Sequence, residues 1–313
     1  MIDIISAIGT IFALILLGSY LRFKSVPSEE YWLYADKLVY WILFPSFLFY
    51  KTSTISVSTE LLTPISHPLL SGLLLTVFII WTASNLFKFD NKAGSSIVQA
   101  AGRHNTFIAL AISERLFGES GLLIATLATA ILIPVTNISI VIALVIILNK
   151  GQQNLFKKIM NDLIRNPLLI AIFTGFLFNY LGFKNILIVH DVTALLGSAT
   201  LPVVLLCIGA SMRFQGLKQT LPALLLSSLG KFIIFPGIVL IVLLQIATPP
   251  DIAIILIIYA ATPTAASGFA LARQMGGDYK LMASLITNQT LISFFTLPFT
   301  IYLASRFLGL EIG

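Results

Sequence analysis

AAGRHNTFIALAISERLFG (residues 100–118) belongs to an apolar segment in which Arg103, His104 and Asn105 stand side by side. A charged side chain at the centre of a membrane helix costs about 2.5–3.5 kcal/mol on insertion scales, so it faces water or polar partners. Such a triplet, at such a depth, predicts an interruption of the helix. The prediction holds only if the surrounding chain lies in a membrane.

The composition of the chain is that of an integral membrane protein. Of its 313 residues, 58% are hydrophobic and only 10% are charged, and the mean hydropathy is +0.98, outside the range of soluble globular domains. Crossing the bilayer takes about 20 mostly apolar residues in a helix. We therefore expect an all-α polytopic membrane protein with ten transmembrane helices, over residues 3–21, 31–50, 66–87, 96–116, 121–148, 166–182, 190–212, 219–247, 251–274 and 280–305.

Other interpretations of these segments fit less well. The segments are continuously apolar and about twice as long as the strands of a membrane barrel. The first one has neither a basic start nor a small-residue cleavage site, so we expect a helix and not a cleaved signal. The one cysteine, Cys207, lies inside an expected span, which excludes an intrachain disulfide.

Basic residues predict the orientation in the membrane. With the N-terminus outside the cytoplasm, twelve of the nineteen Lys and Arg residues fall in cytoplasmic loops and four in outer loops. This bias is the positive-inside signal, so we expect both termini on the extracytoplasmic side of the cell (inner) membrane. The net charge of +6 then reflects topology and contact with anionic lipid, and it does not indicate a nucleic-acid partner.

The two halves of the chain resemble each other at an offset of 158 residues. RLFGESGLLIATLAT (115–129) then lies over RQMGGDYKLMASLIT (273–287), with Arg, Gly, Leu, Ala and Thr at matching positions. Five helices per half is an odd number, so a duplicated half enters the membrane in the opposite orientation, as in many secondary transporters. We expect a first repeat over 1–150, a cytoplasmic linker over 151–165 and a second repeat over 166–313.

The polar triplet has a counterpart in the second half. Under the same offset Asn105 falls on Pro263, and each lies about midway along its segment. Asn105 is a favoured N-cap residue, and Thr262 is expected to cap a half-helix that begins at Pro263. Two half-helices that begin inside the bilayer aim unpaired amides and positive dipole ends at one point. This arrangement favours a bound anion.

The candidate ligands surround these two interruptions, and a structural role stays open for each. Arg103 suits an anion, freed carbonyls or Glu114, and His104 suits either a titrating or a structural imidazole. Lys231, deep in the span 219–247, fits an anion or a carbonyl at a broken helix equally well. The expected substrate-binding residues are Arg103, His104, Asn105, Thr106, Lys231, Thr262, Pro263, Thr264 and Ser267.

Three amides on the adjacent helices are further candidates. Asn137, Asn288 and Gln289 fall in middle turns of their segments, where they suit an ion, a substrate or hydrogen bonds between helices. The chain has no zinc-binding His-Glu-x-x-His pattern, no nucleophile elbow and no Walker loop. We therefore expect no enzyme activity, no cofactor and no bound metal.

Four short motifs occur together along the chain: YWILFPSFLF (40–49), HNTFIALAISERLFG (104–118), LPVVLLCIGASM (201–212) and TPTAASGFALARQMG (262–276). They resemble the auxin efflux carrier family, the bacterial relatives of the plant PIN-FORMED auxin transporters. The resemblance implies a fold similar to that of bile acid symporters and sodium/proton antiporters, with broken fourth and ninth helices that cross. Helices 1, 2, 6 and 7 would form a scaffold that dimerises. Helices 3–5 and 8–10 would form a transport domain that moves as an elevator.

The resemblance also suggests roles for two residues. In the PIN branch the first crossing carries a proline followed by an asparagine that contacts the carboxylate of auxin. Asn105 matches that asparagine, Pro263 matches the proline of the second crossing, and His104 stands where the first proline would be.

The function we expect is secondary transport of a small organic anion, an auxin-like or dicarboxylate-like carboxylate. One alternative is a sodium-coupled symporter of the bile acid type, with Asn137, Asn288 and Gln289 as ion ligands. The other is a membrane sensor, which the lack of any soluble signalling domain disfavours.

Overall fold

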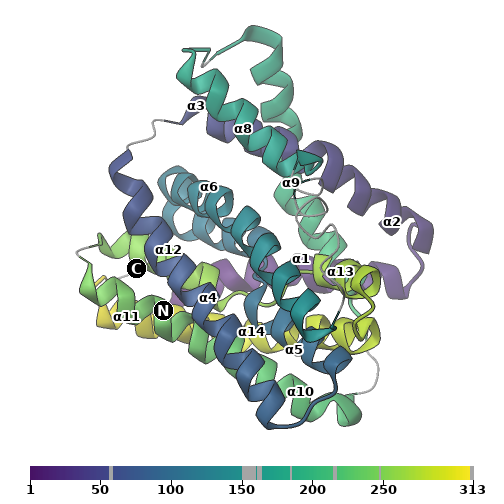
Figure 1. Ribbon diagram of the computed structural model, residues 1–313. Coiled ribbons are helices and arrows are strands. Elements are labelled where there is room, and N and C mark those ends of the chain that lie inside the picture. Colours follow the sequence, from purple (N-terminus) through teal and green to yellow (C-terminus); the bar gives the residue numbers. More distant parts are fainter. Residues whose placement is uncertain are drawn as a thin grey trace.

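The computed structural model describes residues 1–55, 59–149, 160, 164–183, 185–213, 217–246 and 248–310. Within these ranges every regular element is helical (Figure 1). The linker expected over 151–165 lies almost entirely outside the described residues.

The helices of the first half follow the expected segments within a few residues. They are α1 (Ile2–Phe23), α2 (Glu29–Leu38), α3 (Phe44–Thr54), α4 (Leu62–Leu86), α5 (Asn91–Gly102) and α6 (Thr106–Ile147). The π-helical turn η1 (Val39–Leu43) joins α2 to α3, and the short turn η2 (Thr59–Leu61) leads into α4.

The second half also combines long helices with pairs of shorter ones. Its helices are α8 (Pro167–Tyr180), α9 (Leu187–Ser211), α10 (Leu217–Leu229), α11 (Phe235–Gln245), α12 (Pro250–Ala261), α13 (Ser267–Met275) and α14 (Tyr279–Phe307). A second π-helical turn, η3 (Gly230–Ile234), joins α10 to α11.

Side-chain caps fix where several helices begin. Ser28, Asp90, Asn166 and Asp278 each accept a hydrogen bond from the first turn of α2, α5, α8 and α14. Pro167 follows Asn166 in the first helical position, where its missing amide hydrogen costs nothing. Short polar residues next to apolar segments thus set the helix boundaries.

Both π-helical turns precede a proline. Pro45 follows η1 and Pro236 follows η3. Proline removes a backbone donor and its ring clashes with the preceding turn, and the wider π-helical turn accommodates both effects. In η3 this wide turn carries Lys231.

The long helix α6 contains the second part of the fourth expected segment and the fifth expected segment, joined at Gly118. This residue has φ 61° and ψ −147°, a combination that is open to glycine and strained for other residues. The chain therefore changes direction at Gly118, between the two apolar segments.

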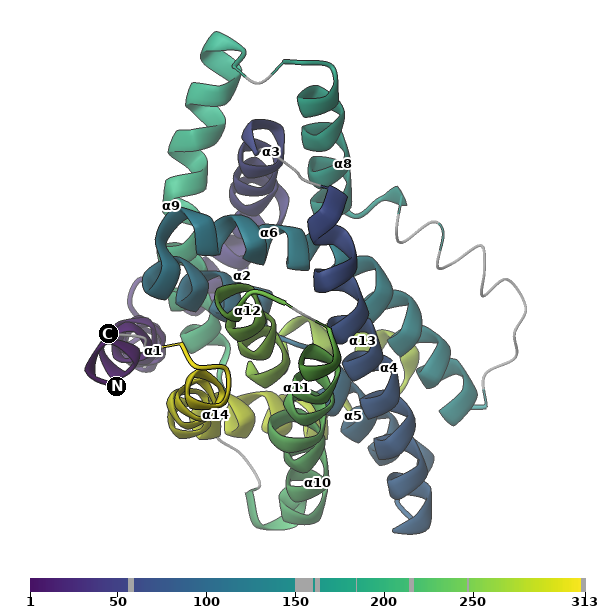
Figure 2. The same ribbon diagram turned by 90° about the vertical axis from the view of Figure 1, so that its left-hand side faces the viewer.

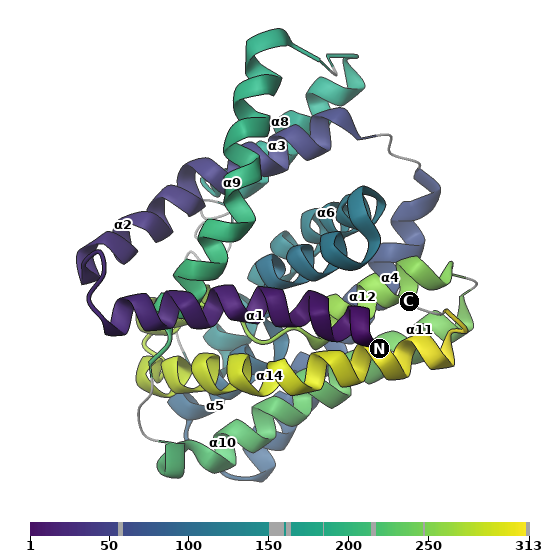
Figure 3. The same cartoon turned by 180° about the vertical axis from the view of Figure 1, so that it is seen from behind.

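The helices pack as two groups (Figures 2 and 3). In one group α1 and α2 pack on α9, and α3 packs on both α8 and α9. In the other, α4 packs on α5 and α11, α12 packs on α6, α11 and α14, and α13 packs on α14. The groups meet where α1, α3, α8 and α9 touch α6 and where α1 touches α14. The assignment of these groups to a scaffold and a moving domain stays a prediction.

The contact between α1 and α9 depends on two glycines. A Cβ at Gly18 would collide with the backbone of Leu206, and one at Gly209 would collide with the backbone of Ile15. Glycine at both positions lets the two backbones approach, as small residues do in membrane helix pairs.

The protein is a multi-pass membrane protein. Among the described residues, six helices are long and apolar enough to cross a membrane, beginning at Ile2, Leu62, Asn91, Leu187, Thr220 and Tyr279. The stretch that begins at Asn91 runs to Ile147 and covers two of our expected segments, and two further apolar helices are shorter. The count of ten spans and the inverted repeat stay predictions.

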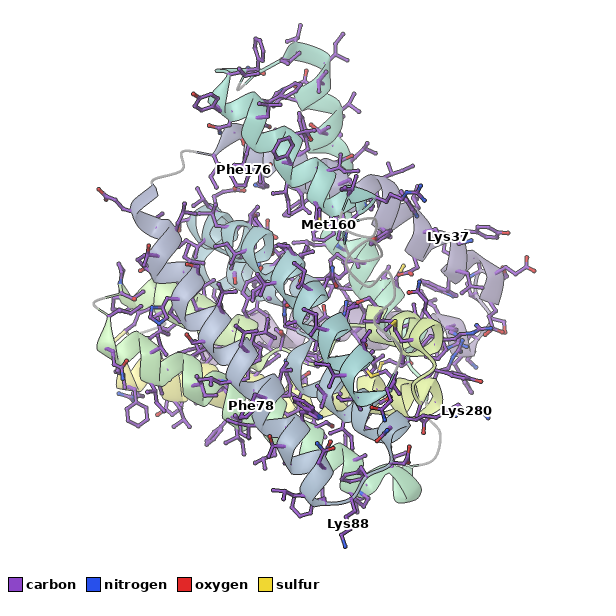
Figure 4. All side chains as sticks on the ribbon, in the orientation of Figure 1. Lys37, Phe78, Lys88, Met160, Phe176 and Lys280 are labelled. Carbon is purple, nitrogen blue, oxygen red and sulfur yellow. The ribbon has the colours of Figure 1, made fainter. Side chains whose placement is uncertain are left out.

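The outer surface of the helices is rich in exposed apolar side chains. Phe78 on α4 points away from the molecule, whereas Lys88 and Lys280 lie near helix ends (Figure 4). The N-terminal end of α1 and the C-terminal end of α14 lie close together (Figure 3). The start of α1 and the end of α14 are therefore at the same end of the molecule.

Candidate functional site

Both the fourth and the ninth expected segments are interrupted. The helix α5 ends at Gly102 and α6 begins at Thr106, with Arg103 and Asn105 in extended conformations between them. The helix α12 ends at Ala261, and α13 begins only at Ser267. The structure thus leaves a short non-helical stretch in each segment.

The two interruptions touch each other. The backbone amide of Asn105 donates to Oγ1 of Thr262 at 3.2 Å, across 157 residues of sequence. Oγ1 of Thr262 in turn donates to the carbonyl of Tyr259 at 2.9 Å. Asn105 is 2% exposed and Thr262 is fully buried, so this crossing lies in the interior.

Our prediction that Thr262 caps the second half-helix is wrong. Thr262 is the residue after the last turn of α12, in an extended conformation, and α13 begins after Ala266 without a side-chain cap. A residue before proline is driven away from the helical conformation, so Pro263 ends α12 at this point. The Thr262 hydroxyl is occupied by the Asn105 amide and the Tyr259 carbonyl.

Asn105 caps α6 as predicted from its residue type. Its Oδ1 accepts from the amide of Ile108 at 3.2 Å, and Thr106 is the first helical residue. With Oδ1 engaged, the side-chain NH₂ of Asn105 is the group left for a ligand, and it can only donate.

Arg103 connects both interruptions to α6. Its Nη2 donates to Oδ1 of Asn137 at 3.2 Å and to Oγ of Ser267 at 3.1 Å. Its Nε and Nη1 are buried and have no hydrogen-bond partner within the described ranges. The guanidinium therefore keeps two unpaired donors at the crossing.

His104 follows Arg103 and is buried, and Lys231 is buried next to Gly230, which packs on Ala101 near the end of α5. The His104 ring is 5.9 Å from the ring of Tyr259, and its Nδ1 has no partner among the described residues. The charges of Lys231 and Arg103 are both near enough to act on this imidazole. Lys231 is fully buried, and its Nζ lies 4.7 Å from the centre of the Phe235 ring without a hydrogen-bond acceptor in the described part of the chain.

The remaining candidate amides divide into two cases. Gln289 joins the crossing, because its Oε1 accepts from the Thr264 amide at 3.2 Å and its Nε2 donates to Ser227 at 3.3 Å. Asn288 instead donates to the backbone and side chain of Ser284 on its own helix. Neither of these two hydrogen bonds of Asn288 reaches the crossing.

Sequence reasoning missed Gln99, one turn before the first interruption. Gln99 is fully buried, and neither its amide oxygen nor its amide nitrogen has a partner among the residues described. A Cβ at Gly268 would lie 3.5 Å from Gln99 Oε1 and 3.6 Å from Arg103 Cδ, so these residues are neighbours. A lone glutamine in the apolar stretch SSIVQAAG (95–102) was the available signal.

A pocket of about 490 Å³ lies between the two helix groups, bounded by α1, α3, α6 and α9. Ala111, which lines it, is six residues after Asn105 on the same helix. Lys51 and Glu119, also in the lining, form an ion pair of 2.7 Å from α3 to α6. The other lining residues are Ile11, Leu14, Phe47, Tyr50, Glu114, Arg115, Ala194, Gly197, Ser198, Leu201, Pro202 and Leu205.

Comparisons with known proteins agree on one class. A family model described as "Membrane transport protein" matches residues 3–301. An uncharacterized transporter of Methanocaldococcus jannaschii is 25% identical over 235 residues, which cover 72% of this chain and 74% of that protein. An uncharacterized transporter of Methanothermobacter thermautotrophicus is 23% identical over 293 residues, which cover 92% of this chain and 94% of that protein.

Proposed function

The chain belongs to the membrane transport protein family, that of the auxin efflux carriers, and from this premise we propose that it is a secondary transporter for a small organic anion. The substrate would bind where the two interruptions cross. The class of substrate is a carboxylate, either auxin-like or dicarboxylate-like.

The observation that carries this proposal is a pair of positive side chains at the crossing without an acidic partner. The ion pairs among the described residues involve Arg22, Lys51 and Arg213, and neither Arg103 nor Lys231. A charge held inside a membrane protein is expected to face a partner or a transport pathway. A mobile anion is the partner that suits both groups.

The helix ends at the crossing support the same sign of charge. The first turn of α6 begins at the crossing, so its partial positive charge and free amides point there. The start of α13 contributes less, because the amides of Gly268 and Phe269 already donate to Ala265 and Ala266. The side-chain NH₂ of Asn105 completes the donor set.

The packing of the helices supports an elevator as the transport mechanism. In this proposal α1–α3, α8 and α9 form the scaffold, which would dimerise, and the remaining helices carry the substrate. The pocket between the groups would be the access route, because its wall on α6 leads to Asn105. Both termini would face the extracytoplasmic side of the inner membrane.

The test is substitution of Asn105. Small carboxylates are first screened for thermal stabilisation of the purified protein, and a stabilising one is then followed by counterflow in proteoliposomes. Asn105→Ala should abolish stabilisation and counterflow, while the loss of its cap lowers folding stability by only about 1 kcal/mol.

The matched control is Asn166→Ala. Asn166 caps α8 through a 2.9 Å bond from the Leu168 amide, so this variant loses an equivalent cap in a helix outside the crossing. It should transport normally. Normal counterflow by Asn105→Ala would refute the proposed site.

A further inference from the structure

The first residue of interest is Asn137, whose oxygen is already taken by a cation. Oδ1 of Asn137 accepts from Nη2 of Arg103 at 3.2 Å, and the same nitrogen lies 3.1 Å from the hydroxyl of Ser267. An amide oxygen and a hydroxyl are ligands that an alkali cation such as sodium would use. Here a guanidinium occupies both of them.

The Arg103 guanidinium joins three separate elements. Arg103 lies in the first interruption, Asn137 lies on α6 beyond the turn at Gly118, and Ser267 is the first residue of α13. A bound inorganic cation would make the same kind of link between these elements. Arg103 makes this link as a permanent part of the chain, because its guanidinium keeps its proton and its charge at physiological pH.

A second cation close to Arg103 would be strongly repelled. The site is buried, and like charges interact more strongly in a protein interior than in water. Among the other amides near the crossing, Gln289 is engaged on both sides, by the Thr264 amide and by Ser227. Asn288 donates to its own helix. Beside Arg103 the described residues leave one unpaired amide oxygen, Oε1 of Gln99, and a single oxygen does not make a sodium site.

The Arg103 guanidinium retains a capacity for an anion. Its Nε and Nη1 are buried without partners among the described residues, and the neighbouring amide of Gln99 is likewise unpaired. The Nη2 atom thus links Asn137 to Ser267, and Nε and Nη1 stay available to bind an anion. A coupled cation would likewise link these two residues and attract an anion.

We propose that Arg103 is a built-in counter-charge that replaces a coupling cation at Asn137 and Ser267, so that the transport cycle requires no sodium. This inference rests on the proposed function for its meaning in transport. Its main test does not, because that test contains no organic anion. Removal of the arginine side chain should create a vacant cation site.

The test measures thermal stability of purified protein in sodium chloride and in choline chloride of equal ionic strength. The unaltered protein should melt at the same temperature in both salts. Arg103→Ala should melt lower in choline, and sodium or a low concentration of guanidinium should raise its melting temperature. Arg115→Ala, which removes an exposed arginine on α6, should respond like the unaltered protein.

Two further variants keep the result unambiguous. Arg103→Gln removes the charge with less loss of volume, and it should gain the same sodium response if Arg103→Ala does not fold. The double variant Arg103→Ala with Asn137→Ala should lose the sodium response, because the ion would lose a ligand oxygen. Stabilisation of the unaltered protein by sodium, or no cation response in either arginine variant, would overturn the proposal.

A transport measurement separates this inference from the proposed function. Uptake of an anion found in the stabilisation screen should run at the same rate with sodium or choline outside the liposomes. A sodium requirement would overturn the built-in counter-charge and leave the anion site intact. Absence of all anion transport, with the cation responses as expected, would refute the proposed function and leave the role of Arg103 intact.

Discussion

Lys231 has no exposed surface, yet no hydrogen-bond acceptor among the described residues reaches its Nζ. The Lys231 ammonium lies 4.7 Å from the centre of the Phe235 ring, a cation–π interaction that only partly replaces the lost hydration. A buried and unpaired charge lowers folding stability. Binding of an anion next to Lys231 would compensate this charge and would explain why a lysine occupies this position.

This gives a prediction for Lys231→Met. Methionine has a similar length and no charge, so the melting temperature without anion should stay the same or rise. The apparent affinity for the carboxylate found in the screen should fall at least tenfold, which corresponds to about 1.4 kcal/mol of binding free energy. Thermal unfolding with and without that carboxylate measures both effects. Lys92→Met, at an exposed position of α5, is the control.

A different outcome would give Lys231 another role. If Lys231→Met lowers stability and leaves anion binding unchanged, then Lys231 supports the π-helical turn of η3 and takes no part in binding. Equal effects of Lys231→Met and Lys92→Met would also contradict a local role at the crossing.

At the scale of residues, the sequence is informative where polarity contrasts with its surroundings. Arg103, His104 and Asn105 are visible because three polar residues interrupt an apolar segment. The cap of α6 follows from the residue type of Asn105. The role of Thr262 was predicted wrongly, because its partner is 157 residues away and no local rule describes such a bond. Gln99 was missed because a single polar residue in a helix carries no periodic signal.

At the scale of elements, Gly118 decides the geometry between the two parts of α6. Its φ is 61° and its ψ is −147°, a conformation that is strained for any residue with a β-carbon. A Cβ added at Gly118 would meet no other atom within 4 Å, so the strain would come from the backbone alone. Gly118→Ala should therefore lower folding stability by about 1–3 kcal/mol through backbone strain alone. Chemical or thermal unfolding in detergent measures this loss.

Gly9→Ala provides the comparison for this prediction. Gly9 lies within α1, and a Cβ there would also meet nothing within 4 Å. Alanine favours the helix over glycine by roughly 1 kcal/mol, so Gly9→Ala should be neutral or stabilising. Similar losses in the two variants would mean that strain at Gly118 is not the cause.

Helix boundaries were predictable because local chemistry sets them. Asp90, Asn166 and Asp278 cap helices close to the expected segment ends, and Pro263 breaks its segment as proline does. The π-helical turns η1 and η3 were not predicted. A proline in an apolar helix is compatible with a kink, a wide turn or a break, and the surrounding packing selects among them.

At the scale of the whole molecule, the ion pair of Lys51 with Glu119 connects the two helix groups. It joins α3 to α6 beside the pocket at 2.7 Å. Both groups must move relative to each other in an elevator. A covalent link at this position should therefore stop transport.

The corresponding prediction uses Lys51→Cys with Glu119→Cys in a background in which Cys207, the one native cysteine, is replaced by alanine. A short dithiol-reactive cross-linker should abolish counterflow in proportion to the cross-linked fraction. The control pair is Arg22→Cys with Glu29→Cys. These residues form an ion pair of 2.7 Å within one group, between α1 and the start of α2, so their cross-link should leave counterflow unchanged. Full counterflow with Lys51→Cys cross-linked to Glu119→Cys would contradict the elevator.

The membrane class, the transporter class and most helix positions could be read from the sequence, because burial in lipid imposes long apolar segments. The family is also recognisable from short motifs such as TPTAASGFALARQMG (262–276), and the family match confirms it. The division of the packing into two groups depends on contacts such as that between Gly18 and Leu206, which no apolar pattern encodes. The inverted repeat and the dimer stay predictions.

The bond from Asn105 to Thr262 also constrains how the protein is made. At about 5–20 residues per second, a ribosome needs on the order of ten to thirty seconds to add the 157 residues between them. During that time the Asn105 amide lacks its acceptor, and hydrocarbon offers no substitute. We therefore expect the early helices to stay in contact with water or with the insertion machinery until the late helices are inserted.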